Sequence, residues 1–130
     1  MASSRFAVSI DTVTAVERLK AATAAVPMGL VAHLDGQANC AKKGITVPPD
    51  QILEIFRPDF AVRVWAADKR AGLDIPIRVH VCQHAGQTWV ACRMPSQVFA
   101  PYACAALDAI GQELDEIFAR ILAALDDARE

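Results

Sequence analysis

The stretch from Ile77 to Met94, IRVHVCQHAGQTWVACRM, has the pattern that decides the fold. On both sides of Ala85-Gly86 every second residue is apolar, and a period of two places successive side chains on opposite faces of a strand. The glycine supplies the backbone freedom that a hairpin turn requires. We therefore predict a hairpin of two strands, residues 77–83 and 88–94, in which Val81 faces Val90 and Val79 faces Cys92.

The two faces of this hairpin differ in chemistry. The apolar face, which we expect to pack against helices, consists of Ile77, Val79, Val81, Val90, Cys92 and Met94. The opposite face consists of Arg78, His80, Cys82, Trp89, Ala91 and Arg93. In this register Arg78 lies opposite Arg93, which is unfavourable unless an anion or an acid lies between them.

Elements on either side of the hairpin follow from the same kind of pattern. Upstream we predict strands over residues 5–10, 28–35 and 51–56, and helices over residues 13–26 and 37–43. The segment from Phe60 to Arg70 fits a strand in its first half and a helix in its second. Downstream, apolar residues at helical spacing from Ala103 to Leu125 predict a long C-terminal helix, in which Gly111 marks a break or kink.

This order of elements predicts an α+β fold of two layers. One mixed sheet of about five strands would carry helices mainly on one face, with the long helix at the C-terminus. A length of 130 residues is usual for one domain, so we predict a single domain over residues 1–130.

Composition and charge exclude some classes of partner. A net charge of −2 provides no general attraction to nucleic acid or to an anionic membrane. The first residues lack the apolar core of a secretory signal, and the longest nearly apolar stretch, Val98–Leu107, is too short to span a bilayer. We therefore expect a cytoplasmic protein in which Cys40, Cys82, Cys92 and Cys104 are thiols.

Three interpretations compete for the polar face of the hairpin. It fits an interface between two protomers, because Trp and Arg are enriched at such contacts. It also fits a small-ligand pocket, in which Arg78 and Arg93 bind a carboxylate or phosphate and Trp89 supplies a flat wall. The third interpretation is a metal site: His80, Cys82 and His84 project to one side of a strand, although no fourth ligand is evident.

Other polar residues have structural explanations. His33 fits a half-buried histidine within a strand, Asp35 a helix N-cap, Cys40 a buried small apolar residue, and Lys42-Lys43 a solvated pair. The chain has no GxSxG, phosphate-binding loop or dinucleotide-binding turn. We therefore assign no catalytic residue and no cofactor, and the sequence favours a protein that is not an enzyme.

The order of several motifs resembles the bacterial family called domain of unknown function 302. The resemblance runs from Phe6 to Met94 and is carried by LDGQAN at residues 34–39, Pro48-Pro49, AADKRAGLDIP at residues 66–76, and the hairpin with Trp89. It implies a compact α+β domain, often a homodimer, with no established activity. It also implies that residues 61–70 are helical.

This chain departs from the family pattern at several positions. Gly36 stands where relatives commonly have histidine, Ile55-Phe56-Arg57-Pro58 replaces Phe-Gly-Asn-Pro, and Arg93 stands near the position of a tyrosine-containing turn. Asp35, Asn39 and Pro58 retain the pattern. If those motifs form the family's ligand site, this copy binds a different ligand or has a degenerate site.

Together these observations lead to a first hypothesis and two alternatives. The first is a homodimeric module that binds a small anionic ligand; its candidate residues are Arg57, Arg78, Arg93, Trp89, Asp35 and Asn39. The second is a metal- or thiol-dependent enzyme or redox protein that uses His80, Cys82 and His84. The third is a domain that serves only for dimerisation.

Overall fold

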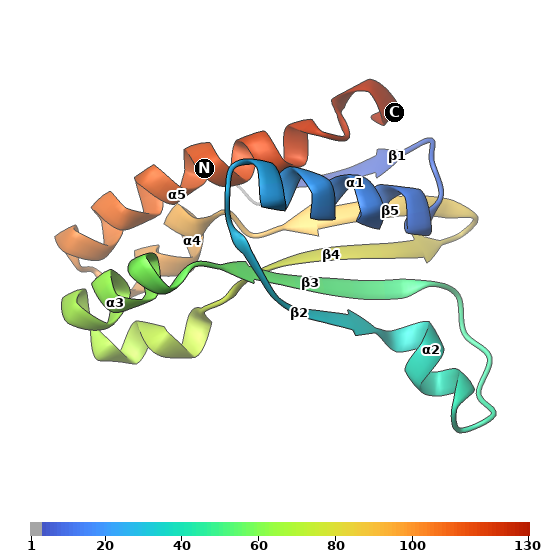
Figure 1. Cartoon of the computed structure of the whole chain (residues 1–130), viewed down its shortest axis with the longest axis horizontal. Helices are drawn as coiled ribbons and strands as arrows, with labels where there is room; N and C mark the ends of the chain where they lie inside the picture. Colours follow the sequence, from blue (N-terminus) through green and yellow to red (C-terminus); the bar gives the residue numbers. More distant parts are fainter. Residues whose placement is uncertain (1–3) are drawn as a thin grey trace.

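The computed structural model describes residues 4–130, which form a five-stranded sheet with helices (Figure 1). The strands are β1 (Ser4–Val8), β2 (Gly29–Asp35), β3 (Asp50–Phe56), β4 (Ile77–His84) and β5 (Gln87–Cys92). Their order in the sheet is β1-β5-β4-β3-β2, and the predicted α+β class is confirmed.

All neighbouring strands in this sheet are antiparallel, so the prediction of a mixed sheet is wrong in that detail. β1 and β2, which are joined through a helix, do run in the same direction. They lie at opposite edges of the sheet, however, with three strands between them. The succession of strand, helix and strand indicates their direction but not which strands become neighbours.

The β4–β5 hairpin has the predicted register. Val79 pairs with Cys92 and Val81 pairs with Val90. The apolar face is buried throughout: Ile77, Val79, Val81, Val90, Cys92 and Met94 are at most 2% exposed.

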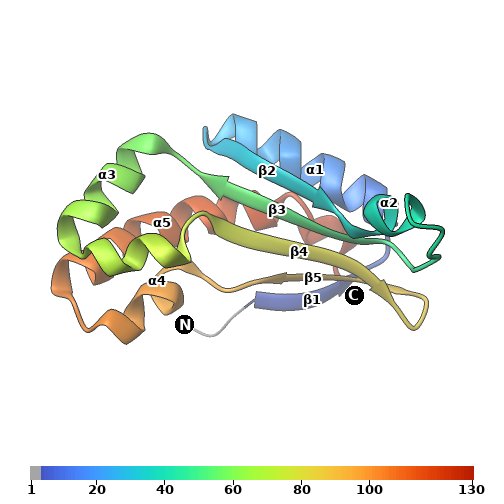
Figure 2. The same cartoon turned by 90° about the horizontal axis from the view of Figure 1, so that it is seen from below.

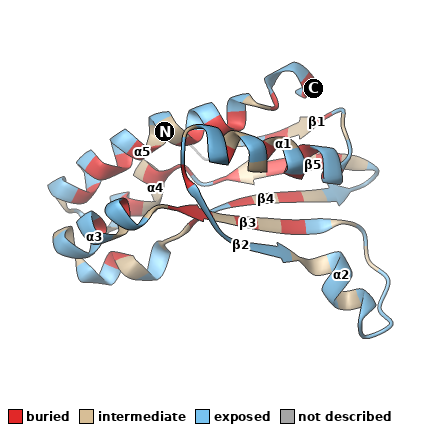
Figure 3. Ribbon diagram, viewed as in Figure 1, coloured by how far each residue is buried: buried red, intermediate tan, exposed pale blue. Residues whose placement is uncertain are grey.

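Two helices, α1 (Thr12–Ala25) and α5 (Ala105–Ala123), lie side by side over one face of the sheet (Figures 1 and 2). α3 (Pro58–Ala67), the 3₁₀ segment η1 (Lys69–Asp74), α4 (Pro95–Phe99) and η2 (Ala100–Tyr102) gather at one end of the molecule. α2 (Gly36–Ala41) lies at the other end and has no buried residue (Figure 3). η3 (Asp126–Ala128) follows α5. No helix in the described part of the chain is long and apolar enough to cross a membrane.

The C-terminal helix α5 buries the predicted apolar stripe, including Leu107, Leu114 and Phe118. It continues through Gly111, so the predicted break is wrong. A Cβ atom at this position would lie only 2.8 Å from Cα of Ser96 in α4. The glycine therefore allows α4 and α5 to approach closely, which is a packing reason for a residue that weakens isolated helices.

The segment after β3 is helical, as the family resemblance implies. α3 begins with Pro58 at the first helical position, where proline has no hydrogen bond to lose. Phe60 and Val64, four residues apart, are buried, while Val62 and Trp65 are 60% and 45% exposed. The local alternation that suggests a strand is therefore overridden by the burial of one helical face.

One edge of the sheet is covered by the C-terminal segment, and the other edge is not paired with a described strand. The backbone of the C-terminal segment lies along β1, because N–H of Ser9 donates to the carbonyl of Ala128 and N–H of Glu130 donates to the carbonyl of Ala7. No described strand pairs with the outer edge of β2. Leu30, Val31 and Leu34 on this strand are 37%, 61% and 43% exposed.

Candidate ligand site on the open face of the sheet

None of the helices within residues 4–130 packs across the face of the sheet opposite α1 and α5 (Figure 2). Strand pairing arranges its side chains in rows that cross the sheet. One row contains Arg5, Ala91, His80 and Ile52, and the next contains Ala7, Trp89, Cys82 and Asp50. We call this surface the open face. It carries all six polar-face residues that the sequence predicts for the hairpin.

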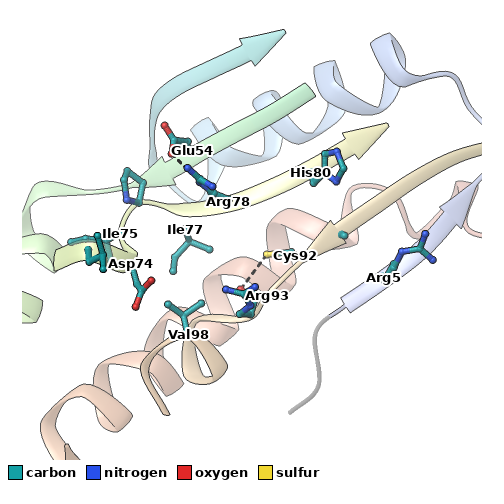
Figure 4. A pocket seen from close by; sticks show the side chains of 13 residues that line it. Arg5, Glu54, Asp74, Ile75, Ile77, Arg78, His80, Cys92, Arg93 and Val98 are labelled. Carbon is teal, nitrogen blue, oxygen red and sulfur yellow. Dashed lines mark hydrogen bonds and ion pairs between the residues drawn. The ribbon is translucent and has the colours of Figure 1, made fainter. Parts of the chain in front are cut away.

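A groove of about 450 Å³ runs over one end of the open face (Figure 4). Three arginines are among its lining residues: Arg5 from β1, Arg78 from β4, and Arg93 just after β5. Its acidic lining residues are Glu54 and Asp74. We call this site the basic groove.

The acids in the basic groove are already engaged within the protein. Glu54 accepts a hydrogen bond from Nε of Arg78 at 3.2 Å, and Asp74 accepts one from the hydroxyl of Tyr102. That hydrogen bond to Asp74 is the main cause that raises the pKa of Tyr102, since it holds the proton on the hydroxyl.

Two of the three guanidinium groups have no acid partner. Within residues 4–130, the side chain of Arg93 forms no hydrogen bond or ion pair, and Arg5 has only the ring of Trp89, 4.1 Å from its guanidinium carbon. Three arginines against the two carboxylates of Glu54 and Asp74 leave the basic groove with one net positive charge, on a surface that is open to a ligand.

The structure places Arg78 and Arg93 in the basic groove and adds Arg5, which sequence reasoning missed; Trp89 does not line the groove but contacts Arg5. Arg5 pairs with Ala91, and this small residue separates it from His80. The alternation of Arg5 with buried Phe6 indicates that Arg5 faces outward. Only the pairing of β1 with β5 places it beside the hairpin.

Arg57 lies in a different place. It binds Asp59 with Nε–Oδ1 of 2.7 Å, donates to the carbonyl of Pro27 at 2.6 Å, and lies over the ring of Phe60. The hydrogen bond to Asp59 is the main cause that raises the pKa of Arg57 and lowers that of Asp59. Arg57 therefore joins the start of α3 to the loop before β2 and is not part of the basic groove.

A second, mostly apolar depression of about 300 Å³ lies beside Arg57. Val31 and Trp65 line it, and Ile75 and Pro76 line both this depression and the basic groove. Ile75 and Pro76 thus lie between Arg57 on one side and Arg78 with Arg93 on the other.

The retained family residues near α2 are also apart from the basic groove. Asp35 caps α2 by accepting a hydrogen bond from N–H of Ala38 at 2.9 Å, which is the structural role expected for it. Asn39 is exposed on α2. Both belong to the α2 end of the molecule (Figure 1), whereas Arg93 lies between β5 and α4, and Asp74 ends η1.

The other polar candidates divide between structural and open positions. His33 hydrogen-bonds to buried Gln51 but is exposed on β2, so the prediction that it is half-buried is wrong. Lys42 and Lys43 are exposed, and Cys40 is half-buried rather than buried. All four cysteines are free thiols.

Strand pairing places Asp50, rather than His84, next to His80 and Cys82. Asp50, His80 and Cys82 have ligand atoms that all lie within 4.8 Å of one another, and Nε2 of His80 is 2.8 Å from Oδ1 of Asp50. His84 is exposed near the turn and is not in this group. Burial is the main cause that raises the pKa of the Cys82 thiol, and the charge of Asp50 adds to it.

These features define a small α+β domain with one helix-covered and one open sheet face, the latter carrying a basic groove. The sequence profile of the family described as Domain of unknown function DUF302 matches residues 5–128. The chain therefore belongs to the DUF302 family. The match extends beyond the motifs of residues 6–94 and includes the long C-terminal helix.

A solved structure supports the same assignment. The chain is similar to an uncharacterised conserved DUF302 protein from Bacillus stearothermophilus, with 25% sequence identity and a TM-score of 0.81 over 99% of each chain. The comparison with curated proteins found no match.

Proposed function

We propose that this chain is a single-domain, homodimeric cytoplasmic module that binds a small anionic ligand in the basic groove without catalysing a reaction. One observation carries the proposal: Arg5, Arg78 and Arg93 line one groove, and two of them have no acid partner in the described chain. A concave surface with unpaired cations binds an anion favourably, because the anion relieves the repulsion between them.

The chemistry of guanidinium narrows the class of ligand. Its planar fork donates two parallel hydrogen bonds to a carboxylate or a phosphate. The guanidinium carbon of Arg5 lies 4.1 Å from the centroid of the Trp89 ring, a contact that restricts this side chain before a ligand arrives. A groove of about 450 Å³ has the size of a small-molecule site. We therefore expect a small phosphorylated or carboxylated molecule.

The test is titration of the reduced, tag-free chain with inorganic phosphate and with malonate, followed by isothermal calorimetry and backbone NMR shifts. We expect shifts along β1, β4 and β5, and at least about tenfold weaker binding for Arg93→Ala, because a charge-assisted hydrogen bond contributes about 1.5–3 kcal/mol. Arg120→Ala, an exposed arginine on α5, is the matched control and should bind like the original chain.

Two results would contradict anion binding in this groove. One is equal affinity of the Arg93→Ala and Arg120→Ala variants, which would show that the anion binds elsewhere. The other is the absence of any shift at millimolar phosphate and malonate. Arg57→Ala should retain anion binding, since Arg57 lines the other depression. Loss of anion binding in this variant would show that Arg57 belongs to the anion site.

The homodimer part of the proposal is supported by the uncovered edge of the sheet. β2 has free backbone donors and acceptors on its outer side together with exposed Leu30, Val31 and Leu34, and such an edge is suited to pairing with a second chain. Sedimentation equilibrium over a range of concentrations should show a dimer. Val31→Lys should shift the equilibrium toward monomer, and a chain that is monomeric at every concentration would reject this part.

A further inference from the structure

The open face holds a second group of functional side chains beside the basic groove. Asp50 begins β3 and pairs directly with Cys82 on β4, and His80 precedes Cys82 by two residues on the same face. A carboxylate, an imidazole and a thiol thus meet, with all three ligand atoms within 4.8 Å of one another.

We propose that Asp50, His80 and Cys82 form a binding site for a single Zn²⁺ ion. Imidazole nitrogen, thiolate sulfur and carboxylate oxygen are the donor types that zinc takes in proteins. With a thiolate and a carboxylate, the site carries two negative charges that the dication neutralises. Three protein ligands leave a fourth position open to water or to another small ligand, as in zinc sites that are not purely structural.

The geometry needs only a small adjustment to reach zinc coordination. Metal–donor distances of about 2.0–2.3 Å place tetrahedral donors roughly 3.5 Å apart. The side chains of His80 and Asp50 are 43% and 54% exposed, so rotation about their side-chain bonds meets little packing. The strand pairing holds the three Cα atoms in place, so the site is organised by the sheet rather than by a loop.

Metal binding requires a defined exchange of protons. The thiol of Cys82 releases its proton to solvent when the sulfur–zinc bond forms, and His80 binds through a neutral nitrogen. Zinc also replaces the hydrogen bond between Nε2 of His80 and Oδ1 of Asp50 if that nitrogen is the ligand. No oxidation or reduction occurs, because Zn²⁺ has no redox chemistry.

This site is independent of the proposed anion-binding function. Its three ligands do not include any arginine of the basic groove, and zinc binding needs no anion. The two sites are neighbours, however, because His80 also lines the basic groove. Failure of phosphate and malonate to bind would therefore leave the zinc proposal standing, and the reverse also holds.

The test uses the reduced chain with no affinity tag, stripped of metal, and measures Zn²⁺ affinity by competition with a chromophoric chelator. We expect one zinc per chain, and at least about tenfold weaker binding for His80→Ala, Asp50→Asn and Cys82→Ser, as expected when a site loses part of its coordination. His84→Ala and Cys40→Ser are matched controls, since both residues lie outside the group, and they should bind zinc as the original chain does. Circular dichroism of each variant checks that it is folded.

A second readout tests the sulfur ligand directly. Co²⁺ in place of Zn²⁺ should give a thiolate-to-cobalt charge-transfer absorption in the near ultraviolet that Cys82→Ser abolishes and Cys40→Ser retains. Absence of stoichiometric zinc would overturn the proposal. Binding that is lost on His84→Ala but kept on Asp50→Asn would also overturn it, because the metal would then be held at the hairpin tip.

Discussion

The two faces of the β4–β5 hairpin are formed by the same two strands, yet they differ in burial and in residue chemistry. On the helix-covered face Val79, Val81 and Val90 are fully buried. One residue along, Arg78 is exposed and His80 and Cys82 are half-buried on the open face. The residues that stabilise this domain and those that carry its candidate chemistry therefore largely alternate along the same strands.

The greatest loss of stability is expected from a cavity in the helix-covered face. Ile77→Ala removes a side chain that is 1% exposed and leaves a cavity, which should lower the free energy of unfolding by about 2–5 kcal/mol. Urea denaturation measures this. Arg93→Ala on the open face is the comparison and should change stability by less than about 0.5 kcal/mol. Equal losses from the two variants would refute the division between the faces.

The second effect concerns Cys92, the thiol on the helix-covered face. Burial raises its pKa to about 12, whereas the thiol of the unfolded chain titrates near its ordinary value of about 8.5. The unfolded chain therefore loses this proton first as the pH rises. The contribution of the protonated Cys92 thiol to the free energy of unfolding is fully present below about pH 8.5. It decreases between that pH and about pH 12, and about 1–2 kcal/mol of it is lost by pH 10.

Cys92→Val is the variant that isolates this loss. Its free energy of unfolding should fall less between pH 8 and pH 10 than that of the original chain, because all other titrating groups are common to both. Urea denaturation at the two pH values gives the difference. An identical pH dependence in the two proteins would show that Cys92 does not titrate as a buried thiol.

A small change in stability is expected when an ion pair on the open face is removed. Arg78→Ala removes the ion pair between Arg78 and Glu54. Because the Arg78 side chain is 65% exposed, the free energy of unfolding should change by less than about 1 kcal/mol. Thermal unfolding at low and high salt measures it, and the difference should shrink as salt screens the pair. A loss as large as that of Ile77→Ala would mean that this arginine supports the fold rather than a ligand.

The predictions that succeeded depend on local pattern. The hairpin register follows from period-two alternation around one turn, and the long C-terminal helix follows from apolar residues at helical spacing, so the order of residues is enough to derive both. Only the family resemblance predicts a helix over residues 61–70, where the structure has α3 at Pro58–Ala67, because local alternation in Val62-Arg63-Val64-Trp65 favours a strand.

The placements that the sequence did not indicate depend on contacts between distant segments. Arg57 was grouped with Arg78 and Arg93 by charge, but Asp59 and Pro27 hold it at the start of α3. Asp50, thirty residues before His80 in the chain, has a carboxylate oxygen within 4.8 Å of the side-chain donor atoms of His80 and Cys82, whereas His84, two residues after Cys82, is not in this group. Nothing in the spacing along the sequence indicates either result.

Patterns in the sequence are enough to derive the α+β class, the register of the hairpin and which of its faces is polar. Each of these follows from backbone geometry that repeats over a few residues. Only the tertiary structure decided that the sheet is antiparallel throughout, that Arg5 joins Arg78 and Arg93, and that Asp50 lies against His80 and Cys82. The physical reason is strand order, which depends on how the whole apolar core packs and brings residues together regardless of their distance in sequence.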